Sequence, residues 1–229
     1  MSASSPAADP LLKSALACLE ARDRDGLADA LRRMLARDPN PGRQWLKIQK
    51  LADIAGETSL SIDMADRAAR ADEATMADKL AYAGTLARLG RTDEALRWLD
   101  EDRAVSGPQA DHLRGTLFAE TGQLAKAETC LRSVLKAVPL SGPTWLTLAG
   151  IRKSGAADAD IGAMRNALRQ PQPPANKAAL HYAIGTALDD AGETDAAFAA
   201  FSAGATIRQQ LAPWNAAEAQ AQVAALCAS

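Results

Sequence analysis

The sequence has few of the residue types that most enzymes and metal proteins use at their sites. Among its 229 residues there are 2 histidines, 3 cysteines and only 4% aromatic residues. Cys18, Cys130 and Cys227 lie far apart and form no CxxC or Cys/His cluster, which argues against a metal site or a disulfide framework. No Ser/His/Asp, Cys/His or paired-carboxylate arrangement is apparent. We therefore expect no enzymatic activity, no cofactor and no metal, and a reducing, cytoplasmic location.

Long apolar runs and a strong net charge are also missing. No stretch approaches the roughly 18 consecutive apolar residues of a membrane-spanning helix, so we expect no membrane insertion. The formal net charge is −2, and nucleic-acid binding, which rewards a concentrated basic surface, is not expected. The N-terminus is rich in Ser, Ala and Pro and lacks the basic start and apolar run of a signal peptide. Residues 1–7 are expected to form a disordered tail.

Alanine and leucine dominate the sequence, and the prolines and glycines punctuate it at regular intervals. This composition favours helix over strand, and proline marks helix starts and ends. Gly56, Gly90, Gly122 and Gly192 each follow one helical segment and precede another, as a tight helix-turn-helix requires. The spacing is 34 residues, then 32, then 70, which is two periods. The chain is therefore predicted to repeat a helix pair about every 34 residues.

The repeat pattern resembles that of the tetratricopeptide repeat family. With this period the repeats begin near Ala8, Gly42, Met76, Pro108, Gly142 and Ala178. Trp45 and Trp145 then occupy the fourth position, five of the six residues at the eighth position are small, and Pro39 and Pro139 close their repeats. The resemblance implies an all-α, right-handed α-solenoid of about six helix-turn-helix repeats over residues 8–211, in which each pair is stabilised by its neighbours.

Two parts of the chain are expected to depart from the regular repeat. In the fifth repeat, Arg152 and Arg165 occupy positions that should be apolar, so we predict an irregular turn and a register shift in its second helix. Residues 212–229 follow the last repeat, and the segment from Trp214 to Cys227 has an apolar side and a polar side. We expect this segment to form a capping helix.

The most distinctive polar feature is a basic stripe on the first helix of the second repeat. Arg43, Lys47 and Lys50 stand at i, i+4 and i+7, one helical face, which in these repeats lines the concave groove. A peptide carboxylate, a phosphate or a sulfate could dock there; the alternative is a solvated face with local salt bridges, and the sequence leaves both open. The other candidate groove contacts are His112, Thr116, Lys153, Tyr182 and Asp189.

A narrower resemblance covers roughly the last third of the chain. The segments WLTLAGIRKSG, DADIGAMRNAL and ALHYAIGTALDDAGETDAAFAAFSAGATIRQQ are similar to the helical region that precedes the catalytic domain in bacterial tetratricopeptide-sulfotransferase proteins. The strand and R-S-G-T-type loop that bind the sulfate donor in that family are not in this sequence, so the resemblance assigns no catalytic residue here.

Two functional hypotheses follow. The leading one is an interaction scaffold that binds a peptide or protein segment in the concave groove. The alternative is the N-terminal accessory region of a sulfotransferase, contributing substrate binding or dimerisation to a catalytic domain that is absent from this chain. The sequence leaves open the identity of the partner and whether the chain forms a homodimer.

Overall fold

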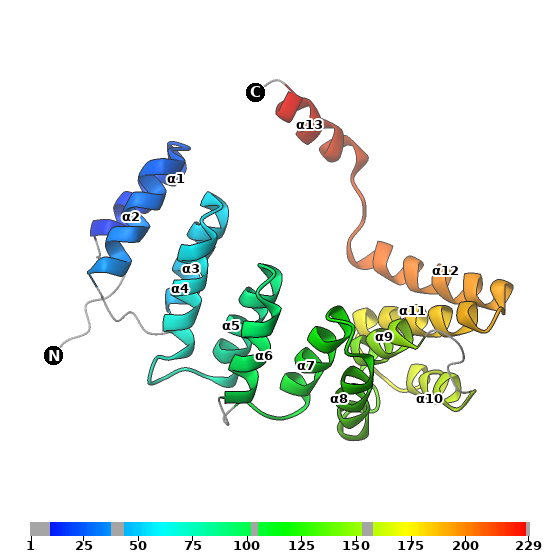
Figure 1. Ribbon diagram of the computed structural model, residues 1–229. Helices are drawn as coiled ribbons and strands as arrows, with labels where there is room; N and C mark the ends of the chain where they lie inside the picture. Colours follow the sequence, from blue (N-terminus) through cyan, green and yellow to red (C-terminus); the bar gives the residue numbers. More distant parts are fainter. Residues whose placement is uncertain (1–9, 38–43, 102–104, 153–157, 228–229) are drawn as a thin grey trace. The chain divides into compact units, whose positions relative to one another are not determined.

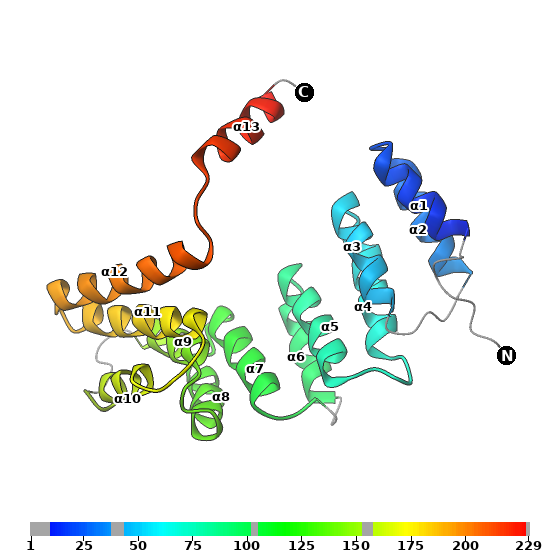
Figure 2. The same ribbon diagram turned by 180° about the vertical axis from the view of Figure 1, so that it is seen from behind.

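The computed structural model describes residues 10–37, 44–101, 105–152 and 158–227, and within these ranges it contains thirteen α-helices and no strand (Figures 1 and 2). The helices are α1 (Pro10–Glu20), α2 (Arg24–Ala36), α3 (Trp45–Ala55), α4 (Thr58–Ala69), α5 (Met76–Arg88), α6 (Thr92–Glu101), α7 (Pro108–Glu120), α8 (Leu124–Ala137), α9 (Gly142–Ile151), α10 (Asp158–Leu168), α11 (Pro174–Asp190), α12 (Thr194–Leu211) and α13 (Ala216–Cys227). The predicted all-α class of paired helices is confirmed.

The first helices of the six pairs begin at or near the predicted repeat starts. Helices α5, α7 and α9 begin at Met76, Pro108 and Gly142, which are the predicted starts of their repeats. Helix α11 begins at Pro174, four residues before Ala178. Proline is favoured in the first turn of a helix because its fixed φ suits the helix and its missing N–H is not needed there.

The chain divides into two compact units, Met1–Leu113 and Arg114–Ser229. In the first unit, α1 packs on α2, α3 on α4 and α5 on α6, and α4 also contacts α2 and α5. The core of this unit includes Leu31, Trp45 and Met64, none of which is more than 1% exposed. Trp45 is therefore a packing residue, as expected for the fourth position of the repeat.

One position of the first unit carries a polar side chain where the repeat usually has a small residue. Gln49 is buried, and its Nε2 donates hydrogen bonds to Ser61 Oγ at 3.1 Å and to Thr85 Oγ1 at 3.0 Å. These bonds connect α3 to α4 and α5. A buried amide is tolerated when its hydrogen bonds are made, so Gln49 replaces close backbone approach with a polar contact between successive pairs.

The second unit has its core between α8 and α12. Trp145, Leu148, Met164 and Leu180 are buried in it, and α11 contacts α9, α10 and α12. Small residues at the eighth position are required here, because a Cβ atom at Gly185 would lie 2.6 Å from Phe201 Cδ1.

The fifth repeat departs from the pattern, although the turn expected to be irregular lies mostly in residues 153–157, outside the described residues. Ile161 and Met164 of α10 are buried, whereas Arg165 is exposed. Arg152 follows the last residue of α9 and forms an ion pair with Asp160, with 2.8 Å between Nη1 and Oδ2. Both arginines therefore avoid the apolar core.

The predicted C-terminal helix forms as α13. Trp214 and Val223 are 78% and 59% exposed, so in the structure the apolar side of this segment does not cover the preceding pair. None of the helices in the described ranges is both long and apolar enough to cross a membrane.

Candidate binding site on α3

The basic stripe predicted on the second repeat lies on the exposed face of α3. Trp45, Ile48 and Ala52 point into the core, and the helical period therefore directs Lys47 and Lys50 to solvent. Both lysines are exposed. Arg43, the third residue of the predicted stripe, lies outside the described residues. Lys47 and Lys50 therefore lie one turn apart on the exposed face of α3, and the binding role predicted for them stays a prediction.

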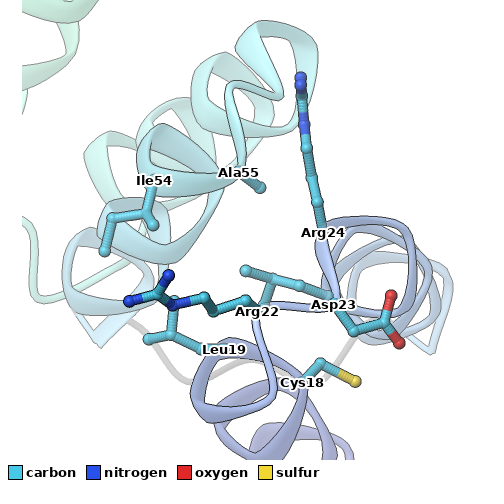
Figure 3. Close-up of a pocket in the computed structure, with 8 residues that line it drawn as sticks. Cys18, Leu19, Arg22, Asp23, Arg24, Ile54 and Ala55 are labelled. Carbon is cyan, nitrogen blue, oxygen red and sulfur yellow. The ribbon is translucent and has the colours of Figure 1, made fainter. Parts of the chain in front are cut away.

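A cavity adjoins this face in the first unit, between the α1–α2 turn and the C-terminal half of α3 (Figure 3). Its volume is about 210 Å³. The residues that line it are Cys18, Leu19, Arg22, Asp23, Arg24, Leu27, Ile54 and Ala55. Ile54 stands four residues after Lys50, which places the two side chains next to each other on the helix surface. Ile54, which lines the cavity, therefore lies on the same side of α3 as Lys50.

The walls of the cavity are mainly apolar and its charged groups are mainly cationic. Leu27 and Ala55 are 2% and 3% exposed, whereas Ile54 is 64% exposed at the rim. The Asp23 carboxylate is used locally, because its Oδ1 accepts a hydrogen bond from Gly26 N at 2.9 Å and so caps α2. Arg22 extends from the turn toward the side of the cavity where Ile54 lies (Figure 3).

The carboxylates at the C-terminal end of α3 and the start of α4 are paired with other cations. Asp53 lies 3.3 Å from Arg88 and accepts a hydrogen bond from the Ser61 hydroxyl at 2.7 Å. Glu57 pairs with Arg32 at 3.1 Å. These two carboxylates therefore do not pair with Arg22 or Arg24.

None of the cations Arg22, Arg24, Lys47 and Lys50 forms an ion pair with a carboxylate in the part of the chain that the structure describes. Lys47 and Lys50 were predicted from the sequence, whereas Arg22, Arg24 and Ile54 were not. A signal for Arg22 exists in the sequence: it stands 34 residues before Gly56 and so occupies the turn position that is glycine in four other repeats. No comparable sequence signal identifies the cavity, which depends on how α1 and α2 pack against α3.

The remaining predicted contacts are on other helices. His112 on α7 is half-buried, and burial lowers its pKa below the usual value. Thr116, also on α7, is half-buried. In the second unit, Tyr182 and Asp189 lie seven residues apart on α11 and share a face, with Tyr182 half-buried and Asp189 exposed. Lys153 lies outside the described residues. The binding role predicted for His112, Thr116, Tyr182 and Asp189 stays a prediction.

Within the described ranges, no group of three or more His, Cys, Asp or Glu side chains is placed to hold a metal ion. What the α3 site offers is an apolar depression flanked by cations, which suits non-covalent recognition of an anionic group next to an apolar one.

Comparisons with known proteins show similarity at the level of the fold. No protein-family model and no curated protein sequence matches significantly. Among solved structures, MamA from Desulfovibrio magneticus RS-1 superposes with a TM-score of 0.51 at 16% identity, covering 73% of this chain and 95% of MamA. PilW, a type IV pilus biogenesis factor, gives 0.51 at 18% identity, covering 93% and 97% of the two chains. BtubC from P. vanneervenii gives 0.52 at 16% identity, covering 90% and 94%.

These likenesses support the tetratricopeptide-type helical repeat that the sequence predicted. At such low identity they say nothing of a shared ligand. The narrower resemblance to sulfotransferase helical regions has no counterpart among these structures and stays a prediction. The chain is thus similar in fold to helical-repeat proteins of the tetratricopeptide type.

Proposed function

We propose that this protein is an interaction scaffold that binds a peptide or protein segment on its first unit, with the exposed face of α3 as a principal contact. The observation that supports this most is the pair Lys47 and Lys50. Both are exposed on one face, and neither has a carboxylate partner among the described residues. Cations held in this way on a rigid repeat favour an anionic segment.

The chemistry favours a protein segment over a nucleic acid. Nucleic-acid binding needs many phosphate contacts, whereas this chain has a net charge of −2 and a local cluster of a few cations. Repeat proteins commonly bind extended segments on their helix faces. PilW, one of the structural neighbours, is a type IV pilus biogenesis factor, and a role in assembly is consistent with a scaffold.

The proposal is tested with a fluorescent acidic peptide made of alternating Asp or Glu and Ser or Gly residues, compared with the same peptide in which Asn and Gln replace the acids. Fluorescence anisotropy at about 0.1 M salt, where the Debye length is about 10 Å, should show tighter binding of the acidic peptide. Reversing both charges, Lys47→Glu with Lys50→Glu, should weaken it about tenfold, since exposed ion pairs contribute up to about 1 kcal/mol each.

The matched control is Lys13→Glu on α1, an exposed lysine that does not line the cavity. It changes the net charge by the same amount per substituted residue. It should leave the affinity for the acidic peptide within about twofold, because a charge farther from the bound peptide than the Debye length of about 10 Å is largely screened. Equal binding of the acidic and amide peptides, or an unchanged affinity of the double variant, would contradict the proposal.

A further inference from the structure

The turn between α1 and α2 has the same backbone geometry as the other tight turns of the repeat but a different residue at its critical position. Asp23 N donates to Cys18 O at 2.8 Å, just as Glu57 N donates to Ala52 O at 2.9 Å in the next turn. This bond closes a helix end that requires a left-handed residue one position earlier. The first turn therefore places Arg22 where the second places Gly56.

Arg22 is the only non-glycine residue with positive φ in the ranges that the structure describes. Its φ is 56°, whereas Gly56, Gly90, Gly122 and Gly192, at the same position of their turns, have φ between 72° and 79°. A side chain with a Cβ atom is disfavoured in this region because Cβ crowds the following carbonyl. Local backbone preference alone therefore favours glycine at position 22, and the arginine needs another reason.

Its neighbour Arg24 has a structural explanation that Arg22 lacks. A Cβ atom at Gly56 would lie 2.9 Å from Arg24 Nη2, so this guanidinium lies against the C-terminal end of α3, where helix carbonyls favour a cation. Arg22 forms no ion pair or side-chain hydrogen bond with a residue in the described part of the chain. It lines the cavity, and Figure 3 shows it directed toward the Ile54 side.

The size of the cavity limits what can occupy it. Pockets that enclose a drug-sized ligand usually measure about 300–1,000 Å³, so a volume of about 210 Å³ suits one side chain better than a whole cofactor. Its walls are formed by Leu19, Leu27 and Ala55, which favour an apolar side chain. The cations at its rim favour carboxylates on either side of that side chain.

We infer that the cavity between the α1–α2 turn and α3 binds a single apolar side chain of an acidic partner segment, and that Arg22 is retained in a disfavoured backbone conformation to pair with a carboxylate next to that side chain. The inference rests on the proposed function and gives it a specificity: the partner carries an aliphatic residue flanked by Asp or Glu. Lys50 then contacts the acidic segment one helical turn away.

The probe is the acidic peptide described above with one Leu at its centre, compared with the same peptide carrying Ala there. The wild-type chain should bind the Leu peptide about tenfold more tightly, because filling the cavity removes an aliphatic side chain from water. Ile54→Glu, a change at an exposed rim position, should abolish this preference for Leu. Leu16→Glu on α1 is the matched control, because Leu16 is also an exposed apolar residue and does not line the cavity.

Arg22→Gly separates binding from folding. Glycine suits the turn, so this variant should unfold at a higher temperature than the wild type, yet it should bind the Leu peptide about fivefold more weakly through the loss of one exposed ion pair. A purely structural role for Arg22 would lower the unfolding temperature instead and leave affinity unchanged, which would overturn the inference.

The outcomes distinguish this inference from the proposed function. If acidic peptides bind in a manner that depends on Lys47 and Lys50, but Leu confers no gain and Ile54→Glu has no effect, the cavity is not part of the site and the inference is overturned while the scaffold proposal stands. If no acidic peptide binds, both fail. Preferential binding of octanoate over the Leu peptide at the cavity would also overturn the inference, since the occupant would then be a free amphiphile.

Discussion

Two groups of arginines in this protein have opposite relations to their surroundings. In the second unit, Arg132 forms two hydrogen bonds of 2.8 Å with the two carboxylate oxygens of Asp160, and Arg152 adds a third of 2.8 Å. In the first unit, Arg22 and Arg24 line a cavity and form no ion pair with the residues that the structure describes. Arginines therefore connect the fourth and fifth helix pairs in the second unit. In the first unit they keep charges that no carboxylate of the described residues neutralises.

This contrast shows that the role of a charged residue depends more on whether it forms an ion pair than on its position in the repeat. Hydrogen bonds from Arg132, aided by the charges of Arg132 and Arg152, hold the pKa of the Asp160 carboxyl below its usual value despite the opposing effect of burial. A group stabilised in its charged form contributes to folding. Arg22 has no such partner and is held in a disfavoured backbone conformation, so removing it should not destabilise the fold.

The largest expected effect comes from breaking the paired cluster. Asp160→Asn removes the charge shared by Arg132 and Arg152 and leaves these two half-buried guanidinium groups with Glu128 as their remaining carboxylate partner, at 3.3 and 3.9 Å. The loss of the three 2.8 Å charged hydrogen bonds should cost about 2 kcal/mol of unfolding free energy. Urea unfolding followed by circular dichroism measures this. The control is Asp29→Asn. Asp29 and Arg33 are both exposed and form an ion pair at 3.5 Å, so this change should alter the free energy of unfolding by less than about 0.5 kcal/mol. An equal loss in both variants would show that the cluster is no stronger than a surface pair.

Acid should weaken the same cluster. Because the folded-state pKa of Asp160 is depressed, its contribution is fully present above the unfolded-state pKa of about 4 and is lost as pH falls through the folded-state pKa. Comparing unfolding at pH 6 and pH 3, the wild type should lose more stability than Asp160→Asn, and the gap between the two should narrow in acid. A constant gap at both pH values would indicate that Asp160 acts by packing rather than by charge.

Two substitutions in the turns of the first unit should change the free energy of unfolding by an intermediate amount, in opposite directions. Arg22→Gly should raise the free energy of unfolding by about 1 kcal/mol, since it relieves a left-handed non-glycine residue. Gly90→Arg, at the equivalent position where no neighbouring side chain would obstruct the new one, should lower it by about the same amount. If Arg22→Gly destabilises the chain, the guanidinium makes a stabilising contact that outweighs the backbone strain.

Much of the fold was predictable because its determinants are local and periodic. The spacing of Gly56, Gly90 and Gly122 gave the helix-turn-helix period, and the structure places each of these glycines at positive φ in a turn. The buried hydrogen bonds of Gln49 were not predictable, because they depend on Ser61 and Thr85 from two other helices. Periodicity shows which residues are buried, whereas the partner of a buried polar group depends on how helices pack.

Part of the candidate site was likewise predictable from the helical period, and part depends on how the helices pack. The exposure of Lys47 and Lys50 follows from the helical period, since Trp45 and Ile48 fix which face of α3 is buried. The cavity beside Ile54 could not be predicted, because three separate helices and a turn define its volume. Arg22 was an intermediate case: the repeat phase marks it as an arginine at a glycine position, but the conclusion that it borders a cavity needs the structure.

The smallest expected effect concerns stability at the proposed binding face. Lys47→Glu with Lys50→Glu should change the free energy of unfolding by less than about 0.5 kcal/mol, because neither lysine is paired among the described residues and exposed substitutions away from special features are usually neutral. Thermal and urea unfolding, measured beside Asp160→Asn, check this. A loss greater than 1 kcal/mol would mean that the two lysines, like Arg132, stabilise the fold. A near-zero change together with weakened peptide binding is what distinguishes charges kept for a partner from charges used within the chain.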